Sequence, residues 1–301
     1  MANRKSNSRS NRFRKNRNRR GKNNNLPKIL MMGSALCAII IFGGATLTHQ
    51  MGLEKIDDNY CYDRTTQHQT AILIDNSVGH DVSSDQLRDY NTAFQNAWNI
   101  APPNSEFLIF TTASDVGGSI ANPIERICKP AQTPFEAETL GTPKQTPPIM
   151  KRQYEEAYSA YQNVIESVVT DVTDSSKRAR NSPLLEQVQA VSRYAWFNKP
   201  SRSFYFITDG TQNSDIARFC AVAGDMPSFS KLETLAKYDF VKPDSFTGVN
   251  VEIVLIESAT LPQFGLEHCT NDEMRRWWPD YFKGNGANDV RLTRLLFGSN
   301  R

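Results

Sequence analysis

The sequence predicts an α/β domain with a doubly wound, mostly parallel sheet, preceded by one transmembrane helix. After residue 70, short continuous apolar runs alternate with amphipathic stretches of helical period. Ahead of them lie nineteen uncharged residues, from Ile29 to Leu47. Continuous apolar runs are typical of strands buried on both faces of a parallel sheet, and their alternation with helices indicates crossover connections.

The first 28 residues form a basic tail that differs from the rest of the chain. They contain eleven Lys and Arg residues and no acidic residue, whereas the remainder has 24 basic and 32 acidic side chains and a net charge of −8. With almost no apolar residue, residues 1–28 are expected to be disordered and to attract anionic lipid. Nucleic-acid binding by the tail is an alternative, but its one aromatic residue, Phe13, provides no stacking pattern.

Residues 29–48 are predicted to form the transmembrane helix. Nineteen helical residues extend about 28 Å, close to the roughly 30 Å of hydrocarbon in a bilayer. A cleaved signal peptide is the alternative, but both the apolar run and the basic region before it are longer than such a peptide needs. The preceding cations orient the N-terminus to the cytoplasm. We therefore expect a single-pass protein of the inner (cell) membrane with a periplasmic or extracellular C-terminal domain.

Four cysteines lie outside the predicted span. An even number of cysteines in an oxidising compartment indicates two disulfide bonds, with three possible connectivities. The alternative is four buried thiols, which follows if the predicted topology is wrong. These cysteines are Cys61, Cys128, Cys220 and Cys269.

Residues 49–69 are predicted to be a polar stalk, followed by a domain over 70–298. The first half of this domain is expected to contain two buried strands, a helix between them, a shorter third strand and a surface insertion. The insertion, 129–149, is rich in proline and threonine. The other elements are a strand over Thr70–Ile74, a helix over 84–99, a strand over Glu106–Thr111 and a strand within 120–128.

The second half of the domain is expected to hold two strands and four helices. Ser182 is predicted to cap a helix that has Pro183 at its first position and runs to about Phe197. The aromatic residues of the helix near 271–283 are expected to pack in the core. The remaining elements are a helix over 151–171, strands over Ser203–Thr208 and Val251–Ile256, and a last helix near 288–297.

Polar side chains follow two of the predicted strands. Asp75 and Ser77 come after the first strand, and Asp209 follows Ser203–Thr208. Because ligands bind beyond the carboxyl ends of strands in open parallel sheets, we expect these side chains to share one site with Ser182. Carboxylate and hydroxyl oxygens suit a hard cation, Mg²⁺ or Mn²⁺.

These motifs resemble the von Willebrand factor type A (vWA) domain and its metal-ion-dependent adhesion site. That family has Asp-x-Ser-x-Ser after the first strand, often Thr-Pro-Leu at a later helix, and Asp-Gly after the fourth strand. The chain has Asp75-Asn76-Ser77-Val78-Gly79, Ser182-Pro183-Leu184-Leu185 and Phe206-Ile207-Thr208-Asp209-Gly210 at the matching places. The resemblance covers about 70–298 and implies that Asp75, Ser77, Ser182 and Asp209 bind the metal.

Two residues depart from the family pattern. Ser182 replaces the commoner threonine and keeps a hydroxyl, whereas Gly79 stands where the family has a second serine. The loss of that hydroxyl leaves a scaffold domain without metal as an alternative. The resemblance also implies a cysteine pairing, Cys61 with Cys128 and Cys220 with Cys269.

The predicted function is non-enzymatic. We expect a membrane-tethered module that binds a protein partner at the carboxyl edge of the sheet, for adhesion or for assembly of an envelope, secretion or conjugation complex. A metal-dependent phosphohydrolase is the alternative, because two aspartates at strand ends also suit that chemistry. A haloacid-dehalogenase-like enzyme, however, needs an aspartate at the position of Ser77.

Overall fold

The computed structural model describes residues 56–62, 68–76, 82–112, 123–142, 145–174, 182–219, 227–257 and 270–296. They belong to one compact unit that begins at Glu54. The predicted tail (1–28) and the predicted span (29–48) lie outside these ranges. Within them, no helix combines the length and the apolar character needed to cross a membrane.

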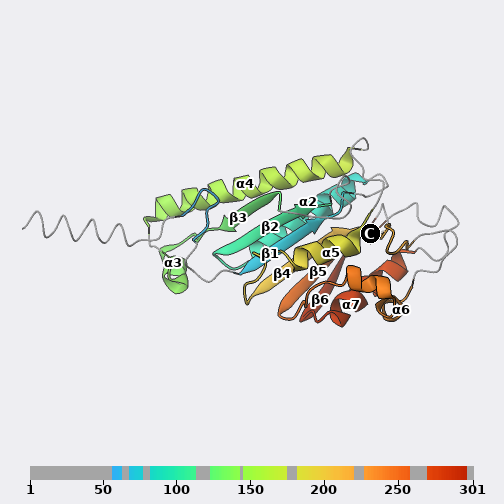
Figure 1. The fold of residues 1–301 in the computed structure, drawn as a ribbon. Helices are drawn as coiled ribbons and strands as arrows, with labels where there is room; N and C mark the ends of the chain where they lie inside the picture. Colours follow the sequence, from blue (N-terminus) through green and yellow to red (C-terminus); the bar gives the residue numbers. More distant parts are fainter. Residues whose placement is uncertain are drawn as a thin grey trace, which may run out of the picture. The chain divides into compact units, whose positions relative to one another are not determined.

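The core of the unit is a six-stranded sheet with the order β3-β2-β1-β4-β5-β6 (Figure 1). β3 runs antiparallel to β2, and all other neighbouring strands are parallel. The predicted fold class, α/β with a mostly parallel sheet, is therefore confirmed. The strands are β1 (Gln69–Ile74), β2 (Ser105–Thr111), β3 (Glu125–Lys129), β4 (Arg202–Thr208), β5 (Val249–Ile256) and β6 (Asp289–Leu295).

Helices cover both faces of the sheet (Figure 1). α2 and α4 pack on one face, and α5, α6 and α7 lie on the other. The bounds are α2 (Ser84–Ile100), α3 (Pro134–Leu140), α4 (Pro147–Thr173), α5 (Leu184–Ser192), α6 (Phe229–Glu233), the 3₁₀ helix η2 (Ala236–Phe240) and α7 (Asn271–Gly284).

Two of the helices begin with reciprocal capping. At α2, the Ser83 hydroxyl accepts the Gln86 backbone N–H, and the Gln86 side chain accepts the Ser83 N–H. Thr270 and Glu273 do the same at α7. Each pair satisfies amide groups that have no partner inside the helix, so the sequence marks both helix starts.

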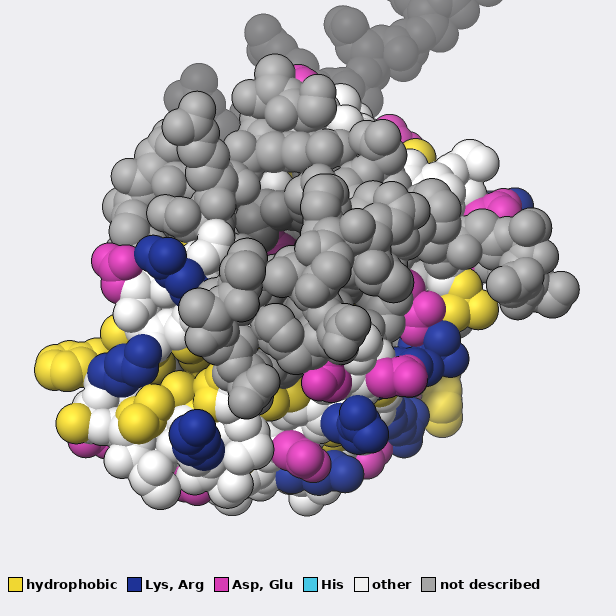
Figure 2. Space-filling model, turned by 90° about the vertical axis from the view of Figure 1, so that its right-hand side faces the viewer, with side chains coloured by type: hydrophobic (Ala, Val, Ile, Leu, Met, Phe, Trp, Pro, Cys, Tyr) yellow, Lys and Arg dark blue, Asp and Glu magenta, His cyan; other side chains and the backbone are white. Residues whose placement is uncertain are grey.

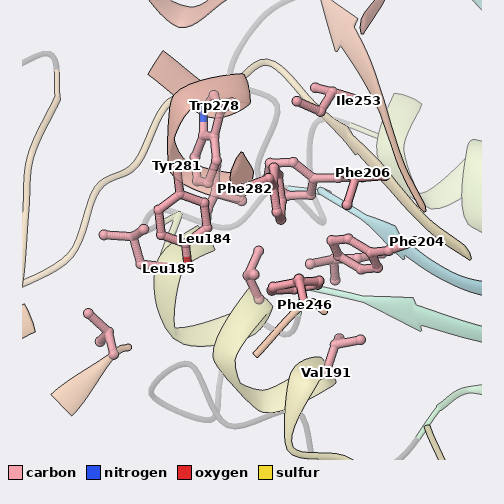
Figure 3. Packing of buried hydrophobic residues seen from close by; sticks show 14 of the residues in the cluster. Leu184, Leu185, Val191, Phe204, Phe206, Phe246, Ile253, Trp278, Tyr281 and Phe282 are labelled. Carbon is pink, nitrogen blue, oxygen red and sulfur yellow. The ribbon is translucent and has the colours of Figure 1, made fainter. Parts of the chain in front are cut away.

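Aromatic side chains fill the space between β4 and α7. Figure 3 shows Phe204 and Phe206 of β4 facing Trp278 and Phe282 of α7. The ring centroids of Phe206 and Trp278 are 4.7 Å apart, and those of Phe204 and Phe282 are 5.7 Å apart. The aromatic residues of α7 are buried, which confirms their predicted place in the core.

Two predicted elements differ in kind from the structure. The segment 129–149 is not a plain surface insertion, because it contains α3, capped by Thr133, and buries Ala137 against Met150. Its prolines lie at helix starts: α3 begins at Pro134 and α4 at Pro147. The N–H that proline lacks would have no partner inside the helix at this position. The predicted helix near 288–297 is strand β6, whose alternating apolar and polar residues have the period of a strand.

The predicted start and end of α5 were also wrong. Ser182 forms a β-bridge with Asn213 rather than capping the helix, and Pro183 occupies the N-cap position. The helix ends at Ser192 instead of continuing to Phe197. The chain must turn there, because β4 begins at Arg202 and runs back through the sheet beside β1.

Part of the predicted stalk (49–69) packs against the domain. Cys61 and Tyr62 are buried, and Gln69 already belongs to β1. The Asp57 carboxylate accepts the N–H groups of Asn59 and Cys61 and forms an ion pair with Arg126 of β3. The segment 56–62 is therefore attached to the antiparallel edge of the sheet.

Candidate site at the carboxyl edge of the sheet

Asp75 lies in the middle of the carboxyl edge, between β2 and β4. Its N–H donates to the carbonyl of Ile207 (2.8 Å), and the Thr112 N–H donates to the carbonyl of Ile74 (3.0 Å). The sheet pairing thus continues one residue beyond β1 and holds the backbone of Asp75 on both sides. Its side chain is completely buried.

Two threonine hydroxyls contact the Asp75 carboxylate. Thr208 Oγ1 donates to Asp75 Oδ2 at 2.7 Å, and Thr112 Oγ1 lies 3.5 Å from Asp75 Oδ1. The Thr112 hydroxyl also accepts the Asn76 N–H at 2.8 Å. Thr112 and Thr208 were not predicted as site residues, although each directly follows or ends a strand next to β1. That strand-end position is the signal that could have identified them.

Asp209 follows β4, the neighbour of β1, and is also buried. Its Oδ1 accepts the Thr211 N–H at 2.7 Å. Burial raises the pKa of Asp209, and the hydrogen bonds from Thr211 act in the opposite direction. The protonated form of this carboxyl group is therefore favoured relative to an exposed aspartate.

Gly210 connects this loop to α7. Its φ of +80° lies in the left-handed region, which favours glycine. A Cβ at this position would stand 2.9 Å from Trp278 Nε1, too close for a normal contact. Trp278 Nε1 donates to the Gly210 carbonyl at 3.0 Å. The conformation of the residue after Asp209 is thus fixed by an indole of the core.

Ser182 is joined to the loop that follows Asp209. Its N–H donates to the Asn213 carbonyl (3.0 Å), and its carbonyl accepts the Asn213 N–H (2.7 Å). In the same loop, Gln212 Oε1 accepts the N–H of Leu185 in the first turn of α5 (2.8 Å). These bonds hold the start of α5 against the segment after β4, so Ser182 and Asp209 belong to two connected loops.

The structure thus places three of the four predicted metal ligands on adjoining elements of one edge. Asp75 follows β1, Asp209 follows β4, and Ser182 is bound to the loop after β4. The fourth, Ser77, lies outside the described residues, as does Gly79. Among the residues with described positions, no three His, Cys, Asp or Glu side chains group together as a metal cluster. The donors brought to this edge are oxygens, which fit a hard cation rather than zinc.

A cavity of about 400 Å³ opens beside this edge. Asn76 and Thr111 line it from the strand ends, and Asn163, Ser167 and Asp171 line it from α4. The three α4 residues are spaced four apart, so they lie along one side of the helix. The cavity thus lies beside Asn76, the residue that follows Asp75.

The described side chains on this side of the domain carry mixed charge. Figure 2 views the molecule from the side at which the parallel strands end, and acidic and basic side chains lie next to one another there. The described side chains that are visible on this side thus show no single dominant sign of charge.

One of the predicted cysteine pairs is present in the structure. Cys61 and Cys128 are joined by a disulfide bond, with their Cα atoms 4.9 Å apart. The bond connects the segment before β1 to β3. The second predicted pair, Cys220 and Cys269, lies outside the described residues.

Comparison with known protein families and with curated proteins finds no match for this sequence.

Proposed function

We propose that this chain is a membrane-tethered, vWA-like module that binds a protein partner and has no catalytic activity. In this proposal, the site at the carboxyl edge holds Mg²⁺ or Mn²⁺, and the metal binds a carboxylate of the partner. The observation that carries it is the placement of Asp75 and Asp209 after two adjacent parallel strands, in a sheet of order β3-β2-β1-β4-β5-β6 with β3 antiparallel.

The donor set supports a hard cation. Asp75 and Asp209 would supply charge, and Ser77 and Ser182 would supply neutral oxygens. Mg²⁺ prefers six oxygens and usually keeps several positions for water or ligand oxygens. A site with only two carboxylates leaves a bound cation electrophilic enough to attract a third carboxylate from a partner.

The proposed location is the cell membrane. Residues 29–48 would anchor the chain, with the basic tail in the cytoplasm and the domain outside. The disulfide between Cys61 and Cys128 supports an oxidising compartment for the domain. In that position the module would serve adhesion or the assembly of an envelope, secretion or conjugation complex.

The metal site is tested by calorimetric titration of the full chain in detergent with Mg²⁺ and with Mn²⁺. We expect binding by the wild type and at least about tenfold weaker binding, or about 1.4 kcal/mol, in Asp75→Asn and Asp209→Asn. Asp215→Asn is the matched control, because Asp215 is fully exposed in the loop after β4. Its affinity should equal that of the wild type.

Two results would contradict the metal-dependent proposal. If the wild type binds neither ion, the domain is a scaffold that binds its partner without metal. If Asp75→Asn and Asp209→Asn bind as tightly as the wild type, the cation lies elsewhere.

A further inference from the structure

The face of the sheet that carries α2 is open over β4, β5 and β6. A groove of about 830 Å³ lies there, with these strands as its floor. One wall is formed by Ala93, Asn96 and Ile100, which lie along one side of α2. Ile100, at the end of this wall, is 74% exposed. The groove is on a face of the sheet, whereas the candidate metal site is at its carboxyl edge.

The two faces of the same strands differ in chemistry. On the α7 side, β4 and β5 present Phe204, Phe206 and Ile253, which are labelled in Figure 3, and also Val251; all four are buried in the core. Strands of a parallel sheet are normally apolar on both faces, because helices cover both. On the groove side, however, the alternate residues of these strands are mostly polar. A permanently packed helix does not account for such a floor.

The polar residues of the floor form two rows across the strands. In the first row, Ser203 of β4, Asn250 of β5 and Asp289 of β6 are direct neighbours in register. Adjacent strands are about 4.8 Å apart, and residues on one face repeat about every 6.6 Å along a strand. The floor is therefore a regular array of hydrogen-bonding groups.

The second row contains Tyr205, Glu252 and Arg291, again in register. Tyr205 is partly buried against the core under α2. Burial and the neighbouring Glu252 carboxylate raise the pKa of Tyr205, so its hydroxyl stays protonated at neutral pH and can both donate and accept. Arg291 is 76% exposed and presents its guanidinium to the groove.

Contacts within the floor hold several of these groups in place. Asn288 Nδ2 donates to Asn250 Oδ1 (3.2 Å), and Arg291 Nε donates to Asp289 Oδ2 (2.9 Å). The hydroxyl of Thr293 donates to Glu252 Oε1 (2.5 Å). Each bond engages one atom of the amide, guanidinium or carboxylate and leaves the others for a ligand. The array is thus oriented before any ligand binds.

The charges of the groove exclude two kinds of occupant. Among the described residues that line it, Glu252 and Asp289 are acidic and Arg291 is basic. A nucleic-acid backbone is disfavoured, because carboxylates outnumber the guanidinium. An apolar helix is disfavoured, because it would bury all three charged groups and supply none of them with a polar partner.

An uncharged ligand with many hydroxyl groups matches the polar side chains of the groove better than nucleic acid or an apolar helix does. Amides, hydroxyls, a carboxylate and a guanidinium in a regular array supply both donors and acceptors to such a ligand, and the Tyr205 ring supplies an apolar surface among them. We propose that the groove over β4, β5 and β6 binds an uncharged oligosaccharide chain. This binding does not depend on the metal site, so the two proposals can fail separately.

The test uses the full chain in a detergent without a sugar headgroup. Chitotetraose, maltohexaose and mannopentaose are titrated by calorimetry up to about 10 mM, which detects binding free energies down to about −2.7 kcal/mol. We expect at least one to bind in the presence of a chelator. Bound oligosaccharide should slow hydrogen exchange in β5 and β6 and leave exchange in α7 unchanged.

Two variants locate the site. Tyr205→Ala and Arg291→Ala should each weaken binding at least about tenfold, or about 1.4 kcal/mol. Arg193→Ala is the matched control, because Arg193 is likewise an exposed arginine paired with an aspartate, Asp244, outside the groove. It should bind like the wild type. Arg291→Lys retains the charge and should keep the fold if the alanine variant does not.

Three results would overturn the proposal. The first is no binding of any of the three oligosaccharides. The second is binding that both Tyr205→Ala and Arg291→Ala leave unchanged. The third is protection from exchange confined to elements other than α2, β4, β5 and β6.

Discussion

The two ends of the central strands both bury a carboxylate, but they hold it by different chemistry. At the amino end, Glu106 is 2% exposed and forms an ion pair with Arg126, which also pairs with Asp57. At the carboxyl end, Asp75 accepts the Thr208 hydroxyl. A guanidinium neutralises the first carboxylate within the fold, whereas a hydroxyl orients the second and adds no positive charge.

The amino end is built for stability in other respects too. Gln69, opposite Glu106 in register, donates to the Trp196 carbonyl (2.6 Å) and accepts the N–H groups of Asn198 (3.1 Å) and Lys199 (3.0 Å). One buried amide therefore satisfies three backbone groups of the turn before β4. Similar buried polar residues thus close the sheet at one end and form the candidate site at the other.

Removal of the disulfide at the amino end should have the largest effect. The bond closes a loop of 67 residues, so its loss from a Cys61→Ala/Cys128→Ala variant should lower the free energy of unfolding by about 4 kcal/mol. Thermal or urea unfolding of the full chain in detergent measures the change. Reducing agent should destabilise the wild type more than the variant, which lacks this bond. Equal unfolding of the two proteins without reductant would contradict the prediction.

Loss of the amino-end carboxylate should have the next largest effect. Glu106→Ala leaves Arg126 and the Gln69 amide without their shared partner. The free energy of unfolding should fall by about 3 kcal/mol. Glu156→Ala is the control, because its ion pair with Arg152 is exposed on α4 and should contribute no more than about 0.5 kcal/mol. Urea unfolding of both variants gives the comparison. A loss of similar size in both would show that burial at the amino end is unimportant.

The carboxyl end should respond most weakly, and in a pH-dependent way. Burial raises the pKa of Asp209 in the folded chain above its ordinary value of 3.8. Between these two pKa values the folded chain retains a proton that the unfolded chain has released. Metal-free wild type should therefore lose stability relative to Asp209→Asn as pH rises from that value through the raised pKa. Unfolding in chelator across this pH range measures the difference.

Added Mg²⁺ sharpens this last test. A cation at the site favours the ionised carboxylate, so it should stabilise the wild type at neutral pH and stabilise Asp209→Asn less. A stability difference that does not change with pH would show that Asp209 keeps the same charge in the folded and unfolded chain.

Four of the strands were well predicted because each contains a short continuous run of apolar or aromatic residues. β1, β2, β4 and β5 begin within two residues of the predicted starts. β6 was missed because it has no such run: its polar residues Asp289, Arg291 and Thr293, which lie in the groove, alternate with apolar ones. α3 was missed because Pro134 was taken as a sign of a loop, although proline is also favoured in the first turn of a helix.

The candidate site was predicted in part, for a similar reason. Asp75 and Asp209 were identified because a carboxylate directly after a buried strand is conspicuous in sequence. Thr112 and Thr208 were not, since a threonine at the end of a strand has ordinary β propensity and its role appears only when the strand order is known. The bridge between Ser182 and Asn213 depends on two loops that are 31 residues apart and have no local signal.

The attachment of residues 56–62 to β3 determines how the domain carries mechanical load. Tension applied to the chain ahead of Asp57 divides at Cys61, between the chain that leads to β1 and the disulfide that leads to Cys128. The ion pair between Asp57 and Arg126 joins the same edge strand. Part of any pull is thus delivered to β3, two strands away from β1. The strand that positions Asp75 therefore carries only part of such a load, which is a useful property for the tethered module proposed above.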